Sequence, residues 1–302
     1  MKSLLIPSAL TLLPMLTALA IVYAVQYQVK RKRRRSPLCS KLLRSPGESL
    51  RIQIDDLTQD LLSYLLLMPL CALLVYSIHL SQSYYGGQPE TISRILSSVL
   101  IVFAFITCFS IKFVKLLNRR RRLRLAHDAE MTVAQGLNQL MLDGYHVYHD
   151  FPAERFNIDH IAVGPAGAFA IETKARTKPT TGNGKSDAEV VYDGQCLKFP
   201  GWSETKPIEQ ALSQAGWLGK WLSSAVGESL GVEPVLTLPG WFVRRTSPNG
   251  ILVLNPKNLR PVLKNKRGAT LSDNLVKRIV HQLDQRCRDV EPKAYWPDGT
   301  KV

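Results

Sequence analysis

The sequence of 302 residues has few cysteines and no closely spaced pair of them. The five lie far apart, without a CxxC motif, at Cys39, Cys71, Cys108, Cys196 and Cys287. This spacing suggests neither a disulfide framework nor a zinc knuckle, so free thiols in a reducing compartment are the simplest interpretation. The sequence also lacks a glycine-rich phosphate loop, and no Ser-His-Asp arrangement stands out in it.

Acidic residues are scarce in the first part of the chain. Residues 1–125 hold 18 Lys and Arg against 5 Asp and Glu, a net charge of +13, whereas residues 126–302 hold 21 against 19, a net of +2. Two basic clusters, at residues 30–35 and 119–124, each follow a long apolar run. This pattern indicates membrane topology rather than a nucleic-acid-binding surface. It predicts a membrane region over residues 1–125 and a second domain over residues 126–302.

Three runs of sequence are almost without charge, at about residues 4–25, 61–80 and 95–117. Each is close to the ~20 residues that a helix needs to cross ~30 Å of hydrocarbon, so we expect three transmembrane helices. A cleaved signal peptide is the alternative for the first run, but its apolar part is only ~7–15 residues long and follows its basic residues. Core helices of a soluble bundle are the other alternative, but these runs have no polar stripe.

The distribution of Lys and Arg around these runs predicts their orientation. The connection between the first two runs holds the cluster at residues 30–35 and three further basic residues, whereas the connection at residues 81–94 holds only Arg94. Basic residues near span ends stay on the cytoplasmic side. We therefore expect a multi-pass protein of the inner (plasma) membrane, with the N-terminus outside and the C-terminal domain cytoplasmic.

A helical pattern over residues 126–142 places an acid on its apolar face. Glu130 precedes Val133, Ala134 and Leu137 by three, four and seven positions, so it points with them toward the core. A carboxylate there costs several kcal/mol unless a cation or a set of donors meets it. Glu130 therefore requires a partner, unless it lies at the rim and its head reaches water.

Three strand-like segments follow, at residues 145–150, 156–163 and 168–173. The last two are joined by GPAG at residues 164–167, a tight turn, so we expect them to pair antiparallel. Asp159 stands five residues before this turn begins and Glu172 five after it ends, so a register that brings the two acids side by side is easily built.

Two adjacent carboxylates repel each other, and a divalent cation between them removes this cost. Oxygen ligands suit Mg²⁺ or Mn²⁺, and Lys174, on the same strand face as Glu172, is placed to oppose negative charge. His160 follows Asp159 and faces the other side of the strand, where we expect it to be packed rather than a ligand.

These motifs carry a resemblance to a known family. The helix with Glu130, the strands IDHIAVG and FAIETK, and the segment KPIEQALSQAGWL together resemble the nuclease-related domain, NERD, of the PD-(D/E)xK nuclease superfamily, over about residues 130–222. The resemblance implies an α/β fold with a restriction-endonuclease-like core, a central mixed sheet flanked by helices. It also implies that Asp159 and Glu172 bind Mg²⁺ or Mn²⁺, that Lys174 activates or stabilises, that Glu130 supports the site, and that Gln210 lies beside it.

We therefore expect a membrane-anchored, metal-dependent nuclease that binds nucleic acid, with DNA favoured over RNA, and the lipid bilayer. The alternative is a catalytically inactive binding or sensing module on the same anchor, because a net charge of +2 is a poor footprint for phosphates. We further expect helices at residues 207–226 and 271–288, strands at residues 235–243 and 250–255, and a mobile loop at residues 177–187.

Overall fold

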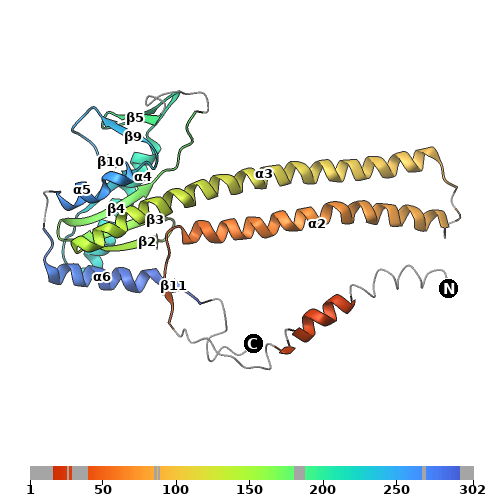
Figure 1. The fold of residues 1–302 in the computed structure, drawn as a ribbon, viewed down its shortest axis with the longest axis horizontal. Coiled ribbons are helices and arrows are strands. Elements are labelled where there is room, and N and C mark those ends of the chain that lie inside the picture. Colours follow the sequence, from red (N-terminus) through yellow and green to blue (C-terminus); the bar gives the residue numbers. More distant parts are fainter. Residues whose placement is uncertain are drawn as a thin grey trace. The chain divides into compact units, whose positions relative to one another are not determined.

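The computed structural model describes residues 16–25, 27–28, 40–84, 87, 89–179, 188–266 and 270–292. The chain divides into two compact units, one of Met1–Leu43 with Asp289–Val302 and one of Arg44–Arg288. In the smaller unit, a short apolar helix covers Leu16–Val25, and β1 (Leu42–Leu43) pairs with β11 (Arg288–Val290). The larger unit holds the other elements (Figure 1).

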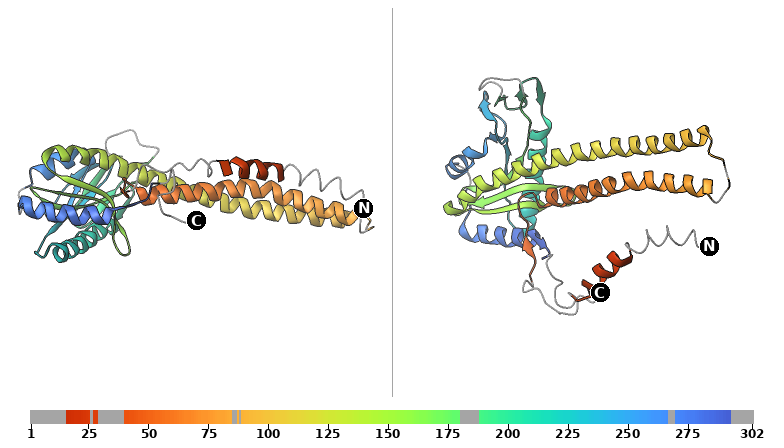
Figure 2. Two further views of the ribbon diagram at one scale, coloured as in Figure 1. Left: turned by 90° about the horizontal axis from the view of Figure 1, so that it is seen from below. Right: turned by 45° about the vertical axis from the view of Figure 1, so that its right-hand side comes forward.

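Two long helices open the larger unit, α2 (Glu48–Tyr84) and α3 (Ile92–Asn138). They run side by side as a hairpin, with Tyr64 and Phe109 in edge-to-face contact (Figures 1 and 2). Both are long and apolar enough to cross a membrane, and their apolar windows are almost wholly exposed.

The expectation of three such helices is wrong for the residues described, which hold two. Of the first predicted span, residues 4–15 lie outside the described residues, as does the basic cluster at residues 30–35. The described remainder of that span, Leu16–Val25, is an apolar helix shorter than a membrane crossing requires.

Helix α3 continues without a break from its apolar part into the predicted second domain. It contains no proline, and its one glycine, Gly136, lies near its end. The helix expected at residues 126–142 is the last part of α3 together with the 3₁₀ turn η1 (Gln139–Asp143). Gly144, with a φ of 82°, ends it in the left-handed conformation typical of glycine after a helix. The predicted boundary between residues 125 and 126 therefore falls inside one helix.

The centre of the larger unit is a five-stranded mixed sheet in the order β10-β8-β4-β3-β2. Its strands are β2 (His146–Pro152), β3 (Asn157–Gly164), β4 (Gly167–Thr173), β8 (Val232–Thr237) and β10 (Leu252–Leu254). The pairing of β3 with β2 and with β4 is antiparallel, and β4, β8 and β10 run parallel. Gly164 lies opposite Gly167, which confirms the predicted tight turn and the antiparallel pairing of the two strands beside it.

Helices cover both faces of this sheet (Figure 2). Residues that alternate along β4 pack on opposite faces of the sheet. Phe169 and Ile171 pack in one core with α3 and α5 (Leu259–Lys264). The 3₁₀ turn η3 (Pro256–Asn258) precedes α5. Ala168 and Ala170 pack in the other core, with α4 (Lys206–Val226) and α6 (Asp273–Cys287). The helices expected at residues 207–226 and 271–288 are therefore confirmed as α4 and α6.

A second, four-stranded sheet has the order β7-β6-β5-β9. Its strands are β5 (Glu189–Tyr192), β6 (Leu197–Phe199), β7 (Trp202–Glu204) and β9 (Phe242–Arg245). The single strand expected at residues 235–243 is wrong, because it is split between β8 and β9, in different sheets, by a turn at Gly240 with a φ of 81°. Of the loop expected at residues 177–187, residues 180–187 lie outside the described residues.

Candidate active site

The five residues predicted for the site line one surface hollow of about 510 Å³. Glu130 comes from α3, Asp159 from β3, Glu172 and Lys174 from the end of β4, and Gln210 from α4. Because these elements are neighbours only in the folded chain, the hollow is a product of the mixed sheet and its two covering layers. It is called the carboxylate hollow below. Leu50 of α2 and Arg122, Leu125 and Ala126 of α3 also line it.

The acids stand in one row across three strands. His160 pairs with Ile171, so the next position of the register sets Asp159 opposite Glu172, as the sequence predicted. On the other side His149 pairs with His160 and Phe151 with Ile158, which sets Asp150 of β2 in the same row. The sequence analysis did not include Asp150 in the site.

Asp159 and Glu172 accept different hydrogen bonds. The backbone N–H of Thr173 donates to Asp159 Oδ2 over 2.7 Å, and the Lys174 ammonium donates to Glu172 Oε1. The Glu172 side chain is 1% exposed, and its Oε2 has no hydrogen-bond partner among the described residues. A buried carboxylate oxygen without a partner is costly, so this position favours a cation or a donor from outside the chain.

The acids raise one another's proton affinity. Burial, and then the charges of Glu172 and Glu130, raise the pKa of Asp159 well above its ordinary value. Burial, followed by the charges of Asp150 and Glu172, raises the pKa of Glu130 to about 8, against smaller opposing effects of Lys174 and the Gly47 backbone. Glu130 is 7% exposed among the buried residues Val133, Ala134 and Leu137, as its spacing predicted. Carboxyls held this closely therefore favour the protonated form unless a cation offsets their charge.

The histidine beside Asp159 belongs to the core. His160 is fully buried, and its Nδ1 lies 2.8 Å from Nδ1 of His149, its cross-strand neighbour. Burial, and then His149, lower the pKa of His160 well below its ordinary value, so the ring is neutral. The prediction that His160 is packed is confirmed.

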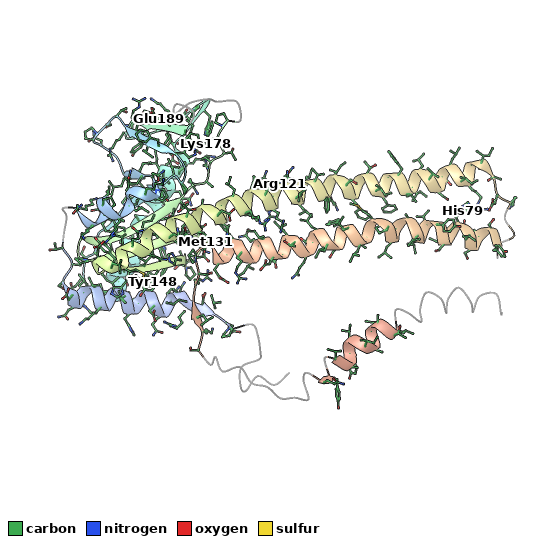
Figure 3. All side chains as sticks on the ribbon, in the orientation of Figure 1. His79, Arg121, Met131, Tyr148, Lys178 and Glu189 are labelled. Atoms are coloured by element: carbon green, nitrogen blue, oxygen red, sulfur yellow. The ribbon has the colours of Figure 1, made fainter. Side chains whose placement is uncertain are left out.

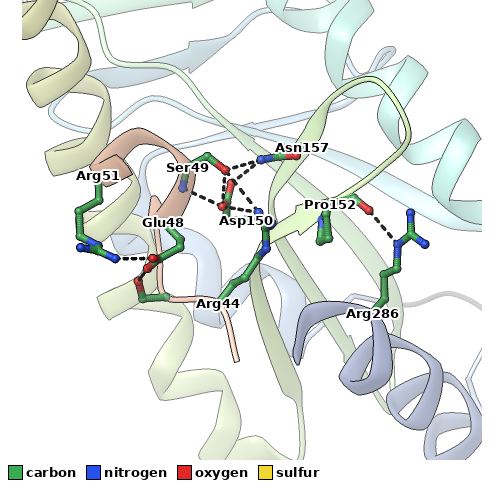
Figure 4. A network of polar contacts seen from close by, with 9 residues as sticks. Arg44, Glu48, Ser49, Arg51, Asp150, Pro152, Asn157 and Arg286 are labelled. Atoms are coloured by element: carbon green, nitrogen blue, oxygen red, sulfur yellow. Dashed lines mark hydrogen bonds and ion pairs between the residues drawn. The ribbon is translucent and has the colours of Figure 1, made fainter. Parts of the chain in front are cut away.

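A polar network ties the beginning of α2 to the sheet beside the hollow (Figure 4). Asp150 Oδ2 accepts hydrogen bonds from the backbone N–H of Ser49 and from Nη1 of Arg44, each over 2.9 Å. Its Oδ1 accepts from Asn157 Nδ2 over 2.9 Å, and Gln214 Nε2 donates to the Asn157 backbone oxygen. A carboxylate at the first N–H groups of a helix also meets the positive end of the helix dipole.

Sequence reasoning missed this network, although one of its members carried a signal. Asn157 lies two positions before Asp159 on the same strand, so the shared strand face was a usable signal. Arg44 and Ser49 carried no signal, because their partner Asp150 is more than a hundred positions away. A second hollow of about 490 Å³ lies over this network and shares Leu50, Glu130 and Asp159 with the carboxylate hollow.

No group of three or more His, Cys, Asp or Glu side chains in the described part of the chain is close enough to hold a metal ion by itself. Asp159 and Glu172 therefore provide a partial set of carboxylate ligands, with the Lys174 ammonium beside them.

The comparison with protein families places residues 125–239 in the nuclease-related domain, NERD. This range contains the predicted region of resemblance and all five predicted site residues. No curated protein and no solved structure matches the chain.

Proposed function

Because residues 125–239 of the chain are a nuclease-related domain, we propose that the protein is a membrane-anchored, metal-dependent nuclease that hydrolyses phosphodiester bonds. The observation that carries this proposal is the meeting of Glu130, Asp159, Glu172 and Lys174 in one hollow open to solvent. Three acids and a lysine converging from three separate elements are a costly arrangement for stability alone.

The donor atoms suit a hard divalent cation. Asp159 and Glu172 would hold it, because they face each other across β3 and β4 and Glu172 Oε2 has no other partner among the described residues. Carboxylate oxygens of this kind favour Mg²⁺ or Mn²⁺. When bound, such an ion supplies a Lewis acid for the phosphate and lowers the pKa of a coordinated water.

The chain's own groups have distinct tasks in this proposal. Lys174, held beside Glu172 by its ion pair, opposes the negative charge that develops on the phosphate. Glu130, with its pKa at about 8, holds a proton at neutral pH and supports the site from α3. Gln210, exposed on α4, offers amide donors and an acceptor at the rim of the hollow.

Membrane anchoring rests on α2 and α3. Their apolar side chains are exposed along the hairpin, which an aqueous setting would disfavour. Both helices have their domain-side ends in the same unit, and their opposite ends, Tyr84 of α2 and Ile92 of α3, form the far end of the hairpin. Six basic residues follow the apolar part of α3 within the range 115–124, whereas Arg94 is the one basic residue near the other end. This asymmetry favours a cytoplasmic nuclease domain.

The test uses the full chain in lipid nanodiscs. Single- and double-stranded DNA and RNA are incubated with Mg²⁺, with Mn²⁺ and with EDTA, and products are resolved by length. We expect cleavage with either ion and none with EDTA. Asp159→Asn and Lys174→Met should abolish it, and Lys178→Met, which removes an exposed lysine charge four positions further on, should retain it.

A second candidate function is a non-catalytic binding or sensing module. The observation that favours it is the partial donor set, since the described residues hold no complete cluster of metal ligands. Binding of Mn²⁺ by the wild-type protein, with every nucleic acid left intact, would select this candidate. Absence of both cleavage and ion binding would overturn the proposal of a metal-dependent nuclease.

A further inference from the structure

The basic cluster at residues 119–124 reaches the carboxylate hollow. Arg122 lines that hollow together with Leu125, Ala126 and Glu130, because α3 passes from its apolar part to Glu130 as one helix. From sequence, the cluster was assigned to membrane topology alone. In the structure one of its members stands at the mouth of the proposed catalytic site.

Helical geometry separates the cluster into two faces. At about 100° per residue, Arg119 falls about 20° from the direction of Glu130, and Arg122 and Arg120 fall about 80° to either side of it. Arg124 and Arg121 fall about 120° and 180° away. The pair Arg119 and Arg122 is called the basic stripe below. The side chains of Arg119, Arg121, Arg122 and Arg124 are exposed. Figure 3 labels Arg121 on the part of α3 between the apolar segment and Met131. Arg120 faces α2, since its Nε donates to Thr58 Oγ1 over 2.9 Å.

No carboxylate among the described residues forms an ion pair with Arg119 or Arg122. The charge of both guanidinium groups is therefore available to a ligand, beside the carboxyl groups of the hollow. A phosphodiester chain satisfies both, since its phosphates pair with guanidinium groups and its scissile phosphate shares a divalent ion with the carboxylates.

The dimensions fit a polymer rather than a single phosphate. Arg119 and Arg122 lie about 16 Å and 12 Å from Glu130 along the helix axis. Phosphates follow one another at about 3.4 Å of axial rise in one strand of a duplex and further apart in an extended strand. The basic stripe thus lies several phosphates away from the acids, along one line.

We propose that Arg119 and Arg122 bind the sugar-phosphate backbone of nucleic acid and direct the strand along α3 into the carboxylate hollow. This inference rests on the proposed function and deepens it. It also supplies the positive surface that residues 126–302, with a net charge of +2, lack. The competing ligand for arginines near a membrane is the anionic lipid headgroup, which has no reason to distinguish the two faces of the helix at one height.

The test compares two double variants of equal charge. Arg119→Gln with Arg122→Gln removes the basic stripe, and Arg121→Gln with Arg124→Gln removes the same charge from the other faces of the same two turns. Binding of a labelled oligonucleotide to the full chain in phosphatidylcholine nanodiscs is measured in EDTA, over a range of salt, so that no cleavage is needed. Each variant's thermal unfolding is recorded to confirm folding.

We expect the stripe variant to bind more weakly and to reduce the slope of log affinity against log salt by about 2, one for each lost phosphate contact. The variant of the other faces should retain the wild-type slope. Equal losses in both variants, or none in either, would overturn the inference. The measurement is repeated in discs that contain phosphatidylserine. If the stripe variant binds the oligonucleotide more weakly than the wild type only in these discs, the arginines are assigned to lipid.

The two proposals fail separately in this design. If the wild-type protein cleaves nucleic acid and the stripe variant binds and cleaves it equally well, the proposal for the basic stripe is wrong and the proposed nuclease function stands. If binding in EDTA depends on the basic stripe but no divalent ion supports cleavage, the proposed nuclease function is wrong and the proposal of a nucleic-acid-binding surface stands.

Discussion

Ser49 and Asp150, 101 positions apart in the chain, are joined at the beginning of α2 by the Ser49 backbone N–H, which donates to Asp150 Oδ2 over 2.9 Å. The same oxygen accepts from Arg44, so one buried carboxylate holds the first turn of a long apolar helix to the sheet of the nuclease-related domain. The apolar hairpin of α2 and α3 and the carboxylate hollow are therefore parts of one unit.

Asp150→Asn tests this attachment. The substitution removes the charge that Arg44 and the first N–H groups of α2 meet, so we expect a loss of about 2 kcal/mol. For a unit of this size that is about 4–8 °C in the midpoint of thermal unfolding of the full chain in nanodiscs. Glu154→Gln, which removes an exposed acid from the connection between β2 and β3, should change the midpoint little. Equal midpoints for the Asp150 variant and the wild type would show that the network adds no stability.

Divalent ions should stabilise the wild-type protein. An ion that binds only the folded chain adds about 2.7 kcal/mol at a hundredfold excess over its Kd. We expect Mn²⁺ to raise the unfolding midpoint, EDTA to reverse the rise, and Asp159→Asn to abolish it. Asp143→Asn is the matched control, because Asp143 lies outside the hollow and pairs with Arg260 and Lys264. A rise of the same size in the Asp159 variant would place the ion elsewhere.

Asp143 itself gives a prediction about pH. Hydrogen bonds from Arg260 and then Lys264 lower its pKa to about 2, below the ordinary 3.8. A carboxyl with a depressed pKa in the folded state stabilises above its ordinary pKa, and this stability is lost as the pH falls toward 2. The midpoint of Asp143→Asn should therefore lie below that of the wild type at pH 7, and the two should converge between about pH 4 and 2. High salt should reduce the difference at pH 7, because the cations of both pairs are exposed.

Two glycines of α4 predict opposite outcomes for the same substitution. A Cβ at Gly216 meets nothing within 4 Å, so Gly216→Ala should stabilise by about 1 kcal/mol through helix propensity. A Cβ at Gly219 lies 3.2 Å from the backbone oxygen of Leu230, which has to move. Gly219→Ala should therefore raise the free energy of unfolding less than Gly216→Ala does. If the backbone at Leu230 does not move, the substitution should destabilise the protein by about 1–3 kcal/mol. Denaturant unfolding of both variants measures the contrast, and equal gains would contradict the close packing of α4 on this segment.

The pairing of the two acids was predictable because every step was local. A glycine-bounded turn fixed the hairpin, and counting outward from the turn set Asp159 opposite Glu172. The burial of Glu130 on the apolar face of its helix was predicted in the same way, from its spacing to Val133 and Leu137. Local patterns of this kind determine register and strand face without knowledge of the rest of the fold.

Two other features could not be predicted from the sequence, because one depends on contacts between distant residues and the other on a helix that continues through a change in composition. The change from apolar to basic composition at residue 119 suggested a domain boundary, yet Arg and Leu are good helix formers and α3 continues through it. Arg122 was therefore assigned to topology and not to the site. Asp150 was missed because its partners Arg44 and Ser49 precede it by about a hundred residues.

The continuity of α3 also sets the reach of the protein. From Leu117, at the end of the predicted span, to Glu130 the helix covers about 20 Å as a stiff rod. A flexible linker of the same 13 residues would have a similar average length but would let the domain wander in every direction. In a chain anchored in a bilayer as proposed, the rod would hold the acids at one height above the lipid surface. Polymers that approach the bilayer to within that distance would then reach the hollow, and those kept further away would not.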